Sequence, residues 1–211
     1  MEFINYDTEK YNFRKIIEDI LETDNLEKIH LKQSYELFVK GTDQSTVWHR
    51  RYYDNLDKFL PLYNEFINEV VKPTFGEDVV YQKIPTFRTQ LVNNLGVFEF
   101  HRDRDYSHNE EERNFFLPFT DAYSTNTIWV ESEEDKADYS PMNTLYGQVV
   151  KWNGNSLMHG NKQNNTLNTR VSVDFRCIPL SKYSEEEGAA AIYSKMKFKV
   201  GDYYEVTKWK Y

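Results

Sequence analysis

Two histidines and one aspartate have the residue types and the spacing of a metal site. His101 and Asp103 stand two residues apart in a run of β-forming residues, Val97–Asp103. Side chains at i and i+2 of a strand point to the same face, so this segment could present an imidazole and a carboxylate to one cation. His159 follows a predicted strand and a turn later in the chain, and we expect it to supply a third ligand. Taken alone, the first pair is equally typical of a surface salt bridge, and the residues further along the chain favour the metal site.

An arginine and a serine on a later segment form a candidate receptor for a carboxylate. Residues Thr169–Cys177 alternate between apolar and polar side chains, which predicts a strand with one apolar and one polar face. Arg170 and Ser172 share the polar face, where a forked guanidinium and a hydroxyl donor can bind one carboxylate. A structural salt bridge from Arg170 to Asp174 or Asp103 is the alternative, because a buried arginine needs an anionic partner.

Three further polar residues are candidate contacts for a substrate. Arg88 and Gln90 share one face of the predicted strand Thr86–Val92. Arg176 lies on the same polar face as the candidate carboxylate receptor, further along that strand. An exposed strand face would explain Arg88 and Gln90 equally well.

Together these residues indicate oxidation chemistry at a metal centre. Two imidazoles and one carboxylate leave three positions open on a six-coordinate ion, which is the ligand set of non-haem Fe(II) oxygenases. An arginine about one strand away could hold the far carboxylate of a keto acid bound to that ion. Two alternatives stay open: a cupin-like metalloenzyme that uses no keto acid, and a non-catalytic jelly-roll binding module. The first of these has no need for the receptor formed by Arg170 and Ser172.

The first third of the chain has the pattern of amphipathic helices. From Glu9 to Thr23, apolar residues recur at i, i+3, i+4 and i+7, which is one face of a helix. A second helical stretch covers residues 48–71, and we expect Pro61 to kink or restart it and Pro73 to end it. Between the two stretches, residues 27–31 could form a short strand.

From residue 79 onward the chain changes to short β-forming runs separated by turn residues. The predicted strands are Val79–Ile84, Thr86–Val92, Val97–Asp103, Asn114–Phe119, Thr127–Glu131, Leu145–Trp152, Thr169–Cys177, Met196–Val200 and Tyr203–Lys208. The last two flank Gly201 and Asp202, a good two-residue hairpin turn. Many short strands without intervening helices favour a mainly β fold, an antiparallel sandwich or barrel with the N-terminal helices packed outside.

Two other chemically reactive residues are expected to lie outside the site. His108 stands in a charged loop with Glu110–Glu112, which we predict to be exposed to solvent. Cys177 lies on the apolar face of its predicted strand, which indicates an inert core thiol. Because it is the only cysteine, an intrachain disulfide and a Cys-rich zinc site are both excluded.

Length and composition limit the classes of fold and partner. A chain of 211 residues predicts one domain, with residues 1–78 as a helical support and residues 79–211 as the core. The 14 Phe, 16 Tyr and 4 Trp argue against disorder, because they supply the large buried areas that disordered segments lack. The net charge of −8 disfavours a protein whose overall field binds nucleic acid or anionic lipid.

The same composition favours a cytoplasmic protein that acts on a small molecule. No apolar run reaches the roughly 18 residues that can span a bilayer, so no membrane partner is expected. The first residues do not form the basic and apolar pattern of a secretory signal. Neither the substrate nor the oligomeric state is predicted by the sequence.

The order of the candidate motifs resembles that of the Fe(II)/2-oxoglutarate-dependent dioxygenases. His101-x-Asp103, His159 and Arg170-x-Ser172 follow one another over a β-rich segment. The resemblance implies that the first three residues ligate Fe(II), and that the arginine and the serine bind the far carboxylate of 2-oxoglutarate. It also implies a double-stranded β-helix, the jelly roll of cupin-like proteins, with the iron at its mouth.

Other segments are similar to particular branches of these dioxygenases. The stretch Asn114–Ala122 followed by Asn126–Ser132 resembles the phytanoyl-CoA-hydroxylase-like branch. The segment Phe198–Tyr204 is similar to small bacterial oxygenases of antibiotic-sugar pathways, the streptomycin-biosynthesis type. The resemblance covers residues 79–208, and within it Asn114 and Thr127 are candidates for the cosubstrate pocket.

The resemblance also implies the reaction. O2 takes the remaining position on the iron, 2-oxoglutarate is decarboxylated to succinate with release of CO2, and a small polar substrate is hydroxylated. Related halogenases have a small residue at the position of Asp103, so its carboxylate favours hydroxylation over halogenation.

Overall fold

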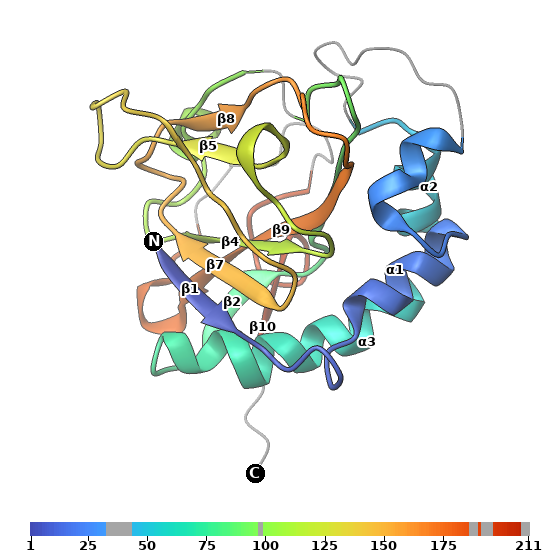
Figure 1. Ribbon diagram of the computed structural model, residues 1–211. Helices are drawn as coiled ribbons and strands as arrows, with labels where there is room; N and C mark the ends of the chain where they lie inside the picture. The colour runs from blue at the N-terminus through green and yellow to red at the C-terminus, as the bar shows by residue number, and fades with distance from the viewer. Residues whose placement is uncertain (33–43, 97–98, 186–189, 191–195, 208–211) are drawn as a thin grey trace.

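Two antiparallel sheets form the body of the molecule (Figure 1). The computed structural model describes residues 1–32, 44–96, 99–185, 190 and 196–207. The larger sheet has the strand order β1 (Glu2–Asn5), β7 (Gln148–Trp152), β4 (Arg113–Pro118), β9 (Arg170–Pro179), β2 (Val79–Gln82) and β10 (Tyr204–Val206), with β3 (Thr86–Gln90) also paired to β9. The smaller sheet has the order β6 (Ser140–Pro141), β5 (Ile128–Val130) and β8 (His159–Asn161). The predicted mainly β architecture is confirmed.

Three α-helices cover one face of the larger sheet (Figure 1). They are α1 (Phe13–Leu21), α2 (Val47–Asp54) and α3 (Leu56–Phe66), and α3 continues into a π-helical turn, Ile67–Val71. Short 3-10 turns occupy Leu26–Leu31, Lys72–Thr74, Asp103–Tyr106, Ser124–Asn126 and Leu180–Lys182. The N-terminal helices therefore pack on the outside of the sheet, as the sequence predicts.

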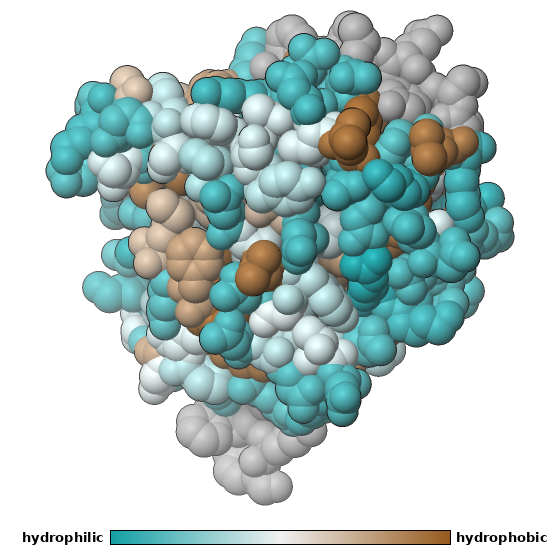
Figure 2. Space-filling model, in the orientation of Figure 1, coloured by the Kyte–Doolittle hydropathy of each residue, from teal (hydrophilic) through white to brown (hydrophobic). Residues whose placement is uncertain are grey.

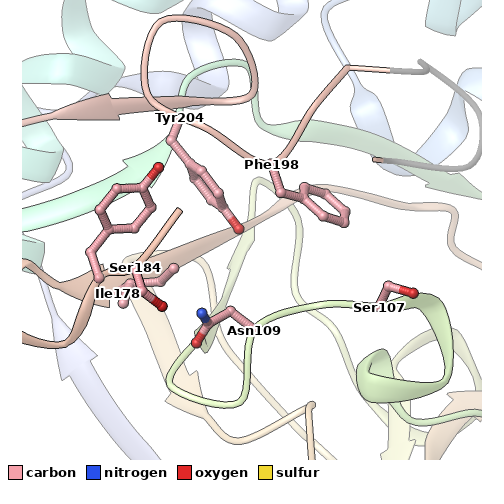
Figure 3. A pocket seen from close by; sticks show the side chains of 7 residues that line it. Ser107, Asn109, Ile178, Ser184, Phe198 and Tyr204 are labelled. Carbon is pink, nitrogen blue, oxygen red and sulfur yellow. The ribbon is translucent and has the colours of Figure 1, made fainter. Parts of the chain in front are cut away.

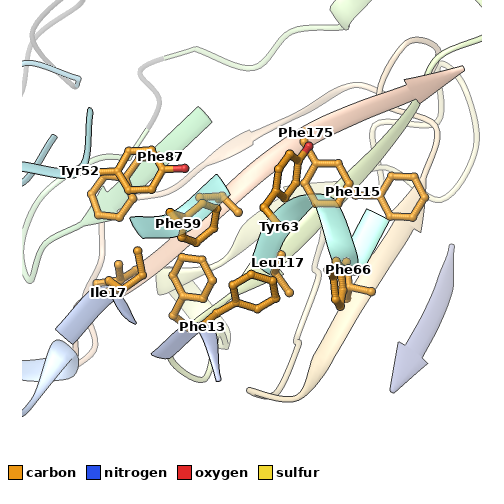
Figure 4. Packing of buried hydrophobic residues seen from close by; sticks show 14 of the residues in the cluster. Phe13, Ile17, Tyr52, Phe59, Tyr63, Phe66, Phe87, Phe115, Leu117 and Phe175 are labelled. Atoms are coloured by element: carbon orange, nitrogen blue, oxygen red, sulfur yellow. The ribbon is translucent and has the colours of Figure 1, made fainter. Parts of the chain in front are cut away.

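The core between the helices and the sheet is built from aromatic rings. Phe59, Tyr63 and Phe66 of α3 are fully buried against the strands (Figure 4). Phe115 of β4 and Phe175 of β9 stack with their ring centroids 5.1 Å apart. Each such ring contributes about 1.5–3 kcal/mol through its burial. The rings also determine the strand register, because a slip of one residue would move them to the opposite face of the sheet.

Strand β9 turns its apolar side chains to the helices and its polar side chains to the other face of the sheet. The buried apolar members of the helix-facing core on this strand are Val171, Val173, Phe175 and Cys177. On the opposite face, Phe116 of β4 packs with Val130 of β5 and joins the two sheets. Because Phe116 pairs directly with Asp174, the polar face of β9 looks toward the smaller sheet. The predicted alternation is confirmed, and so is the burial of the Cys177 thiol.

Two features of the helical segment differ from the prediction. The second helical stretch breaks at Asn55, whereas Pro61 lies inside α3. Pro61 is exposed, so the carbonyl group that lacks its N–H partner can bind water. The predicted short strand near residue 27 is a 3-10 helix, Leu26–Leu31, because Leu26 and Ile29 are buried on one side at a spacing of three residues.

Two predicted strands are not formed in the described residues. Between residues 99 and 103, His101 makes only an isolated β-bridge, with His159, and Asp103 begins a 3-10 turn. Val97 and Phe98 lie outside the described residues. Residues 196–200 form no strand either, and the predicted hairpin is wrong because β10 pairs with β2. This pairing covers a strand edge whose backbone groups would otherwise lack partners.

The first residues of the chain belong to the larger sheet. Strand β1 runs antiparallel to β7, with Phe3 opposite Val150 (Figure 1). The segment 1–78, which was predicted to be a helical support, therefore begins with a sheet strand. The pairing satisfies the backbone N–H and C=O groups along the outer edge of β7.

The surface of the molecule is mainly hydrophilic on the face that Figure 2 shows, where apolar residues form only small separate groups. Among the described residues, most of the aromatic side chains are instead buried, and Figure 4 shows part of this core. Among the helices of the described residues, none combines the length and the apolar character that crossing a membrane requires.

A buried histidine of α2 predicts one pH effect on stability. Burial lowers the pKa of His49 from 6.5 to about 4, and the positive charge of Arg88 adds to this shift. The unfolded chain therefore takes up the proton first, and this residue lowers the free energy of unfolding by about 1.4 kcal/mol per pH unit between pH 6.5 and about 4. Urea unfolding of wild type and His49→Gln across this range should show a shallower decline in the variant. Parallel declines would contradict the assignment.

Candidate functional site

Three side chains converge as a candidate metal centre. His101, Asp103 and His159 each direct one ligand atom to a common point, with these atoms within 4.8 Å of one another. Asp103 Oδ1 lies 3.6 Å from His101 Nε2 and 3.7 Å from His159 Nε2. Within the described residues, no other such group of His, Cys, Asp and Glu side chains occurs.

The imidazoles have the tautomer that metal binding requires. The Nδ1 of His101 lies 3.0 Å from the Glu99 carbonyl, and that of His159 lies 2.9 Å from the Leu157 carbonyl. A carbonyl oxygen can only accept, so each Nδ1 carries the proton and donates it. In the neutral form of such an imidazole the lone pair is on Nε2, and both Nε2 atoms face Asp103, which is the donor set that a divalent cation fits.

A pair of backbone hydrogen bonds holds the two histidines together. The N–H of His101 donates to the carbonyl of His159 over 2.9 Å, and the N–H of His159 donates to the carbonyl of His101 over 3.0 Å. Gly160 makes this approach possible. A Cβ at that position would lie 2.8 Å from Cδ2 of Phe100 and 3.0 Å from its Cα, closer than such atoms approach in proteins.

The carboxylate of Asp103 is held from one side. Its Oδ2 accepts hydrogen bonds from Asn114 Nδ2 at 2.6 Å and from Arg176 Nε at 2.8 Å. Gly154 lets Asn114 reach this position, since a Cβ there would lie 2.7 Å from Asn114 Nδ2. With Oδ2 bound in this way, Oδ1 remains directed at the imidazoles of His101 and His159.

The protonation states of the three residues suit a cation. Burial alone would raise the pKa of Asp103, but the positive charge of Arg176 outweighs this effect and holds the pKa well below the usual range. Burial lowers the pKa of His159 to about 4, although the charge of Asp103 opposes the shift. At neutral pH the site therefore offers an ionised carboxylate and a neutral His159 imidazole. The His159 ring packs against Trp152 with the ring centroids 4.6 Å apart.

Arg170 is a buried guanidinium whose hydrogen-bond partners are all neutral. It is 2% exposed and donates to the carbonyl of Asn126 at 3.0 Å, to Ser172 Oγ at 2.7 Å and to Gln90 Oε1 at 3.1 Å. Burial lowers its pKa to about 10, so it stays charged at neutral pH. No carboxylate of the described residues lies at ion-pair distance from it. The predicted structural salt bridges are not formed, because Asp103 pairs with another arginine, Arg176, and Asp174 does so with Arg88.

The other predicted residues surround these two groups with contacts of their own. Arg88, a candidate substrate contact, forms an ion pair with Asp174 at 3.0 Å. Gln90 instead accepts a hydrogen bond from Arg170, and Arg176 donates to the carboxylate of the candidate metal centre. Thr127, a candidate for the cosubstrate pocket, is fully buried and donates its hydroxyl to the Met142 carbonyl. Asn114, the other such candidate, binds the same carboxylate as Arg176.

The loop that was predicted to be solvated is partly buried. The side chain of His108 is 9% exposed, and its Nδ1 lies 2.9 Å from Oε2 of Glu112, which is itself fully buried. The prediction was wrong because charge alone was taken to indicate exposure, whereas Arg176 and Tyr204 from distant strands approach Glu112.

Sequence reasoning also missed an ion pair that joins the two ligand segments. Arg102 donates from Nε to the Ser156 carbonyl at 2.8 Å and from Nη2 to Glu131 Oε1 at 3.2 Å. The same Glu131 oxygen accepts from the backbone N–H of Met158 at 2.6 Å. The pair therefore fixes the residues beside both histidines. Glu131 is the last residue of the predicted strand Thr127–Glu131, and its neighbours in the sequence do not indicate this contact.

Comparison with known proteins identifies one relative by sequence and several by fold. No family model matches the chain. The streptomycin biosynthesis protein StrG of Streptomyces griseus is 35% identical over 203 residues, which cover 96% of each chain.

Two solved structures share the fold. The non-heme alpha ketoglutarate dependent carbocyclase SnoK from nogalamycin biosynthesis matches with a TM-score of 0.56 and 12% identity, over 98% of this chain and 91% of that one. CytC3, solved with Fe(II) and alpha-ketoglutarate, matches with a TM-score of 0.53 and 11% identity, over 96% and 87%. Identities this low establish a common fold only.

The close approach at Gly160 predicts a stability effect. Gly160→Ala should lower the free energy of unfolding by about 1–3 kcal/mol, because the new Cβ meets the ring and the Cα of Phe100. In a Phe100→Ala background the ring contact is gone, and the same substitution should cost less. Urea unfolding of the two single variants and the double variant measures the difference. An equal cost in both backgrounds would show that the ring contact is unimportant.

Proposed function

The chain belongs to the family of the streptomycin biosynthesis protein StrG, and on that premise we propose that it is an Fe(II)- and 2-oxoglutarate-dependent oxygenase that hydroxylates a small polar molecule. One observation carries the proposal: a buried guanidinium with only neutral partners lies in the same fold as a His-Asp-His cluster. The likeness to StrG supports the streptomycin-biosynthesis-type branch. The two antiparallel sheets support a double-stranded β-helix.

The metal would be held by His101, Asp103 and His159. Each imidazole uses Nδ1 as a donor to a backbone carbonyl and so leaves Nε2 for the cation, and the carboxylate is already ionised. Three protein ligands leave three positions for a chelating keto acid and O2, and a bound Fe(II) supplies the oxidative chemistry there. The carboxylate of Asp103 occupies the position at which a halide would have to bind, so we propose hydroxylation as the outcome.

Arg170 would bind the distal carboxylate of 2-oxoglutarate. A guanidinium buried without an anion carries a large desolvation cost, which a bound dicarboxylate offsets through charge-assisted hydrogen bonds. Ser172 lies 2.7 Å from Arg170 Nη1 and can contribute a hydroxyl to the same carboxylate. Gln90 and Asn126 orient the guanidinium from its other side.

A glycine borders the guanidinium. A Cβ on Gly96 would lie 3.0 Å from Arg170 Nη2 and 3.2 Å from Asn161 Oδ1. Asn161 in turn donates to Gln90 Oε1 at 3.2 Å and to the Thr127 carbonyl at 3.0 Å. These amide groups fix Gln90, and through it the orientation of the arginine, before any ligand arrives.

The alternatives make different demands on the same residues. A cupin-like metalloenzyme without a keto acid would use the three metal ligands and would leave the charge of Arg170 uncompensated. A non-catalytic binding module would need neither the tautomers of the histidines nor the ionised Asp103. The contacts of both groups therefore favour the oxygenase.

Anaerobic titration with Fe(II) and then 2-oxoglutarate tests this function. We expect a metal-to-ligand charge-transfer band in the visible spectrum at one equivalent of each, because the keto acid chelates the iron. His101→Ala and Asp103→Ala should abolish the band, and His30→Ala, which removes a histidine that contacts Thr169 outside the cluster, should keep it. Iron binding without the band would favour the metalloenzyme that uses no keto acid. Binding of neither would favour the non-catalytic module.

Substitution of the arginine separates its role from that of the metal ligands. Arg170→Ala should weaken 2-oxoglutarate binding at least about tenfold, because it removes a charge-assisted contact of about 1.5–3 kcal/mol. Arg170→Lys keeps the charge without the forked geometry and should lose less affinity. Fe(II) affinity in the absence of 2-oxoglutarate should stay within about twofold in both variants. Equal loss of both affinities in Arg170→Ala would mean that the residue supports the fold only.

A further inference from the structure

A second buried carboxylate lies behind the candidate metal centre. Glu112 is fully buried, and its Oε1 accepts a hydrogen bond from the hydroxyl of Tyr204. Its Oε2 lies 2.9 Å from His108 Nδ1 and 3.5 Å from Arg176 Nε. A carboxylate is almost never buried in this way without a cationic partner, and Arg176 is the permanently charged group beside it.

Arg176 is shared between two carboxylates. Its Nε and Nη2 each lie 2.8 Å from Oδ2 of Asp103, on the side away from the imidazoles, while its Nε also faces Glu112. The three groups form a continuous series of negative, positive and negative charge, in which both carboxylates are buried and the arginine side chain is 13% exposed. Asp103 is therefore connected to Glu112 through a single guanidinium.

The position of Arg176 creates an electrostatic problem for a metal site. Its positive charge lies directly behind the carboxylate that would bind the cation, and buried like charges repel strongly because little water screens them. The guanidinium also draws negative charge from the Asp103 carboxylate, which makes Oδ1 a weaker ligand for the cation. The carboxylate of Glu112 compensates both effects, since it neutralises the guanidinium from the far side.

We propose that Glu112 is a positioning residue of the metal centre, which acts through Arg176 and keeps Asp103 able to bind a divalent cation. Arg176 holds Oδ2 in place, so Oδ1 alone is presented to the metal. Glu112 supplies the charge that lets a guanidinium occupy this position without expelling the cation. This role rests on the proposed function, because it requires a divalent ion at His101, Asp103 and His159.

The C-terminal segment keeps Glu112 in this environment. Tyr204 belongs to β10, and its ring extends toward the loop that carries Asn109 (Figure 3). Phe198 packs against His108 with ring centroids 4.6 Å apart. Phe198 and Tyr204 are both almost completely buried. Figure 3 shows the small hollow that Phe198, Tyr204 and Asn109 help to line. Glu112 itself is fully buried, so bulk solvent does not surround its carboxylate.

Metal titration of the full-length protein tests this role. The probe is Co(II) alone, followed by its visible absorption, with no keto acid present. Glu112→Gln keeps the shape of the side chain and removes its charge, and it should weaken Co(II) binding by about 10- to 100-fold, as substitutions behind metal ligands do. Asp78→Asn is the matched control, because it removes a mostly buried carboxylate that pairs with Lys72 and Thr207 near β10, and its affinity should stay within about twofold.

Repeating the substitution without the guanidinium distinguishes this role from a structural one. In an Arg176→Gln background, Glu112→Gln should change the Co(II) affinity by less than about threefold, since the charge that Glu112 compensates is gone. Removal of both members of a buried ion pair is tolerated better than removal of one, so the double variant can be titrated even if Glu112→Gln alone fails to fold. A loss of tenfold or more in that background would overturn the proposal.

The remaining outcomes separate the two levels of inference. Wild type that binds Co(II) with an unchanged affinity in Glu112→Gln would overturn the role of Glu112 and leave the metal centre standing. Wild type that binds no Co(II) would overturn the metal centre, and the role of Glu112 with it.

Discussion

The site depends on how one buried carboxylate is held. Asp103 has two oxygens in different surroundings: Oδ2 accepts from Asn114 and Arg176, and Oδ1 faces two imidazoles. Because the donors saturate one oxygen, the other is oriented before a cation arrives, and the cost of ordering the ligand is met during folding. The positive charge of Arg176 also keeps the carboxylate ionised in spite of its burial. Glycines at positions 154 and 160 provide the space that these contacts need.

Strand β9 links this site to the stability of the fold. Its odd-numbered side chains from Val171 to Cys177 are packed under aromatic rings of the helices, so the register of the strand cannot shift. The even-numbered side chains are thereby directed to the opposite face, where Arg170 and Arg176 stand six residues apart. The aromatic core on one face of the strand thus places both guanidinium groups on the other.

These two arginines illustrate how the partners of a buried charge separate its roles. Arg176 is bound by the carboxylates of Asp103 and Glu112, so its charge is compensated within the protein. Arg170 has only amide, hydroxyl and carbonyl partners, and its charge calls for an anion from outside. Both residues share the polar face of the strand in the sequence pattern. Only their neighbours distinguish an internal clamp from a candidate ligand receptor, and most of these come from β3, from the 3-10 turns Asp103–Tyr106 and Ser124–Asn126, and from the loop that carries Glu112.

Local pattern in the sequence determined much of the architecture and the identity of the converging residues. The period of two in β9, the helical spacing before residue 72 and the order of His101, Asp103, His159 and Arg170 are properties of neighbouring residues, so they can be read from the chain. The reason given for the first pair was wrong, since Asp103 begins a 3-10 turn and does not continue a strand. Their proximity comes instead from the backbone bridge to His159 and from donors on β4 and β9. Only the tertiary structure decided which charges are buried and what compensates them, because burial and charge pairing depend on segments that are distant in the sequence. Glu112, Glu131 and the two arginines are the examples in this protein.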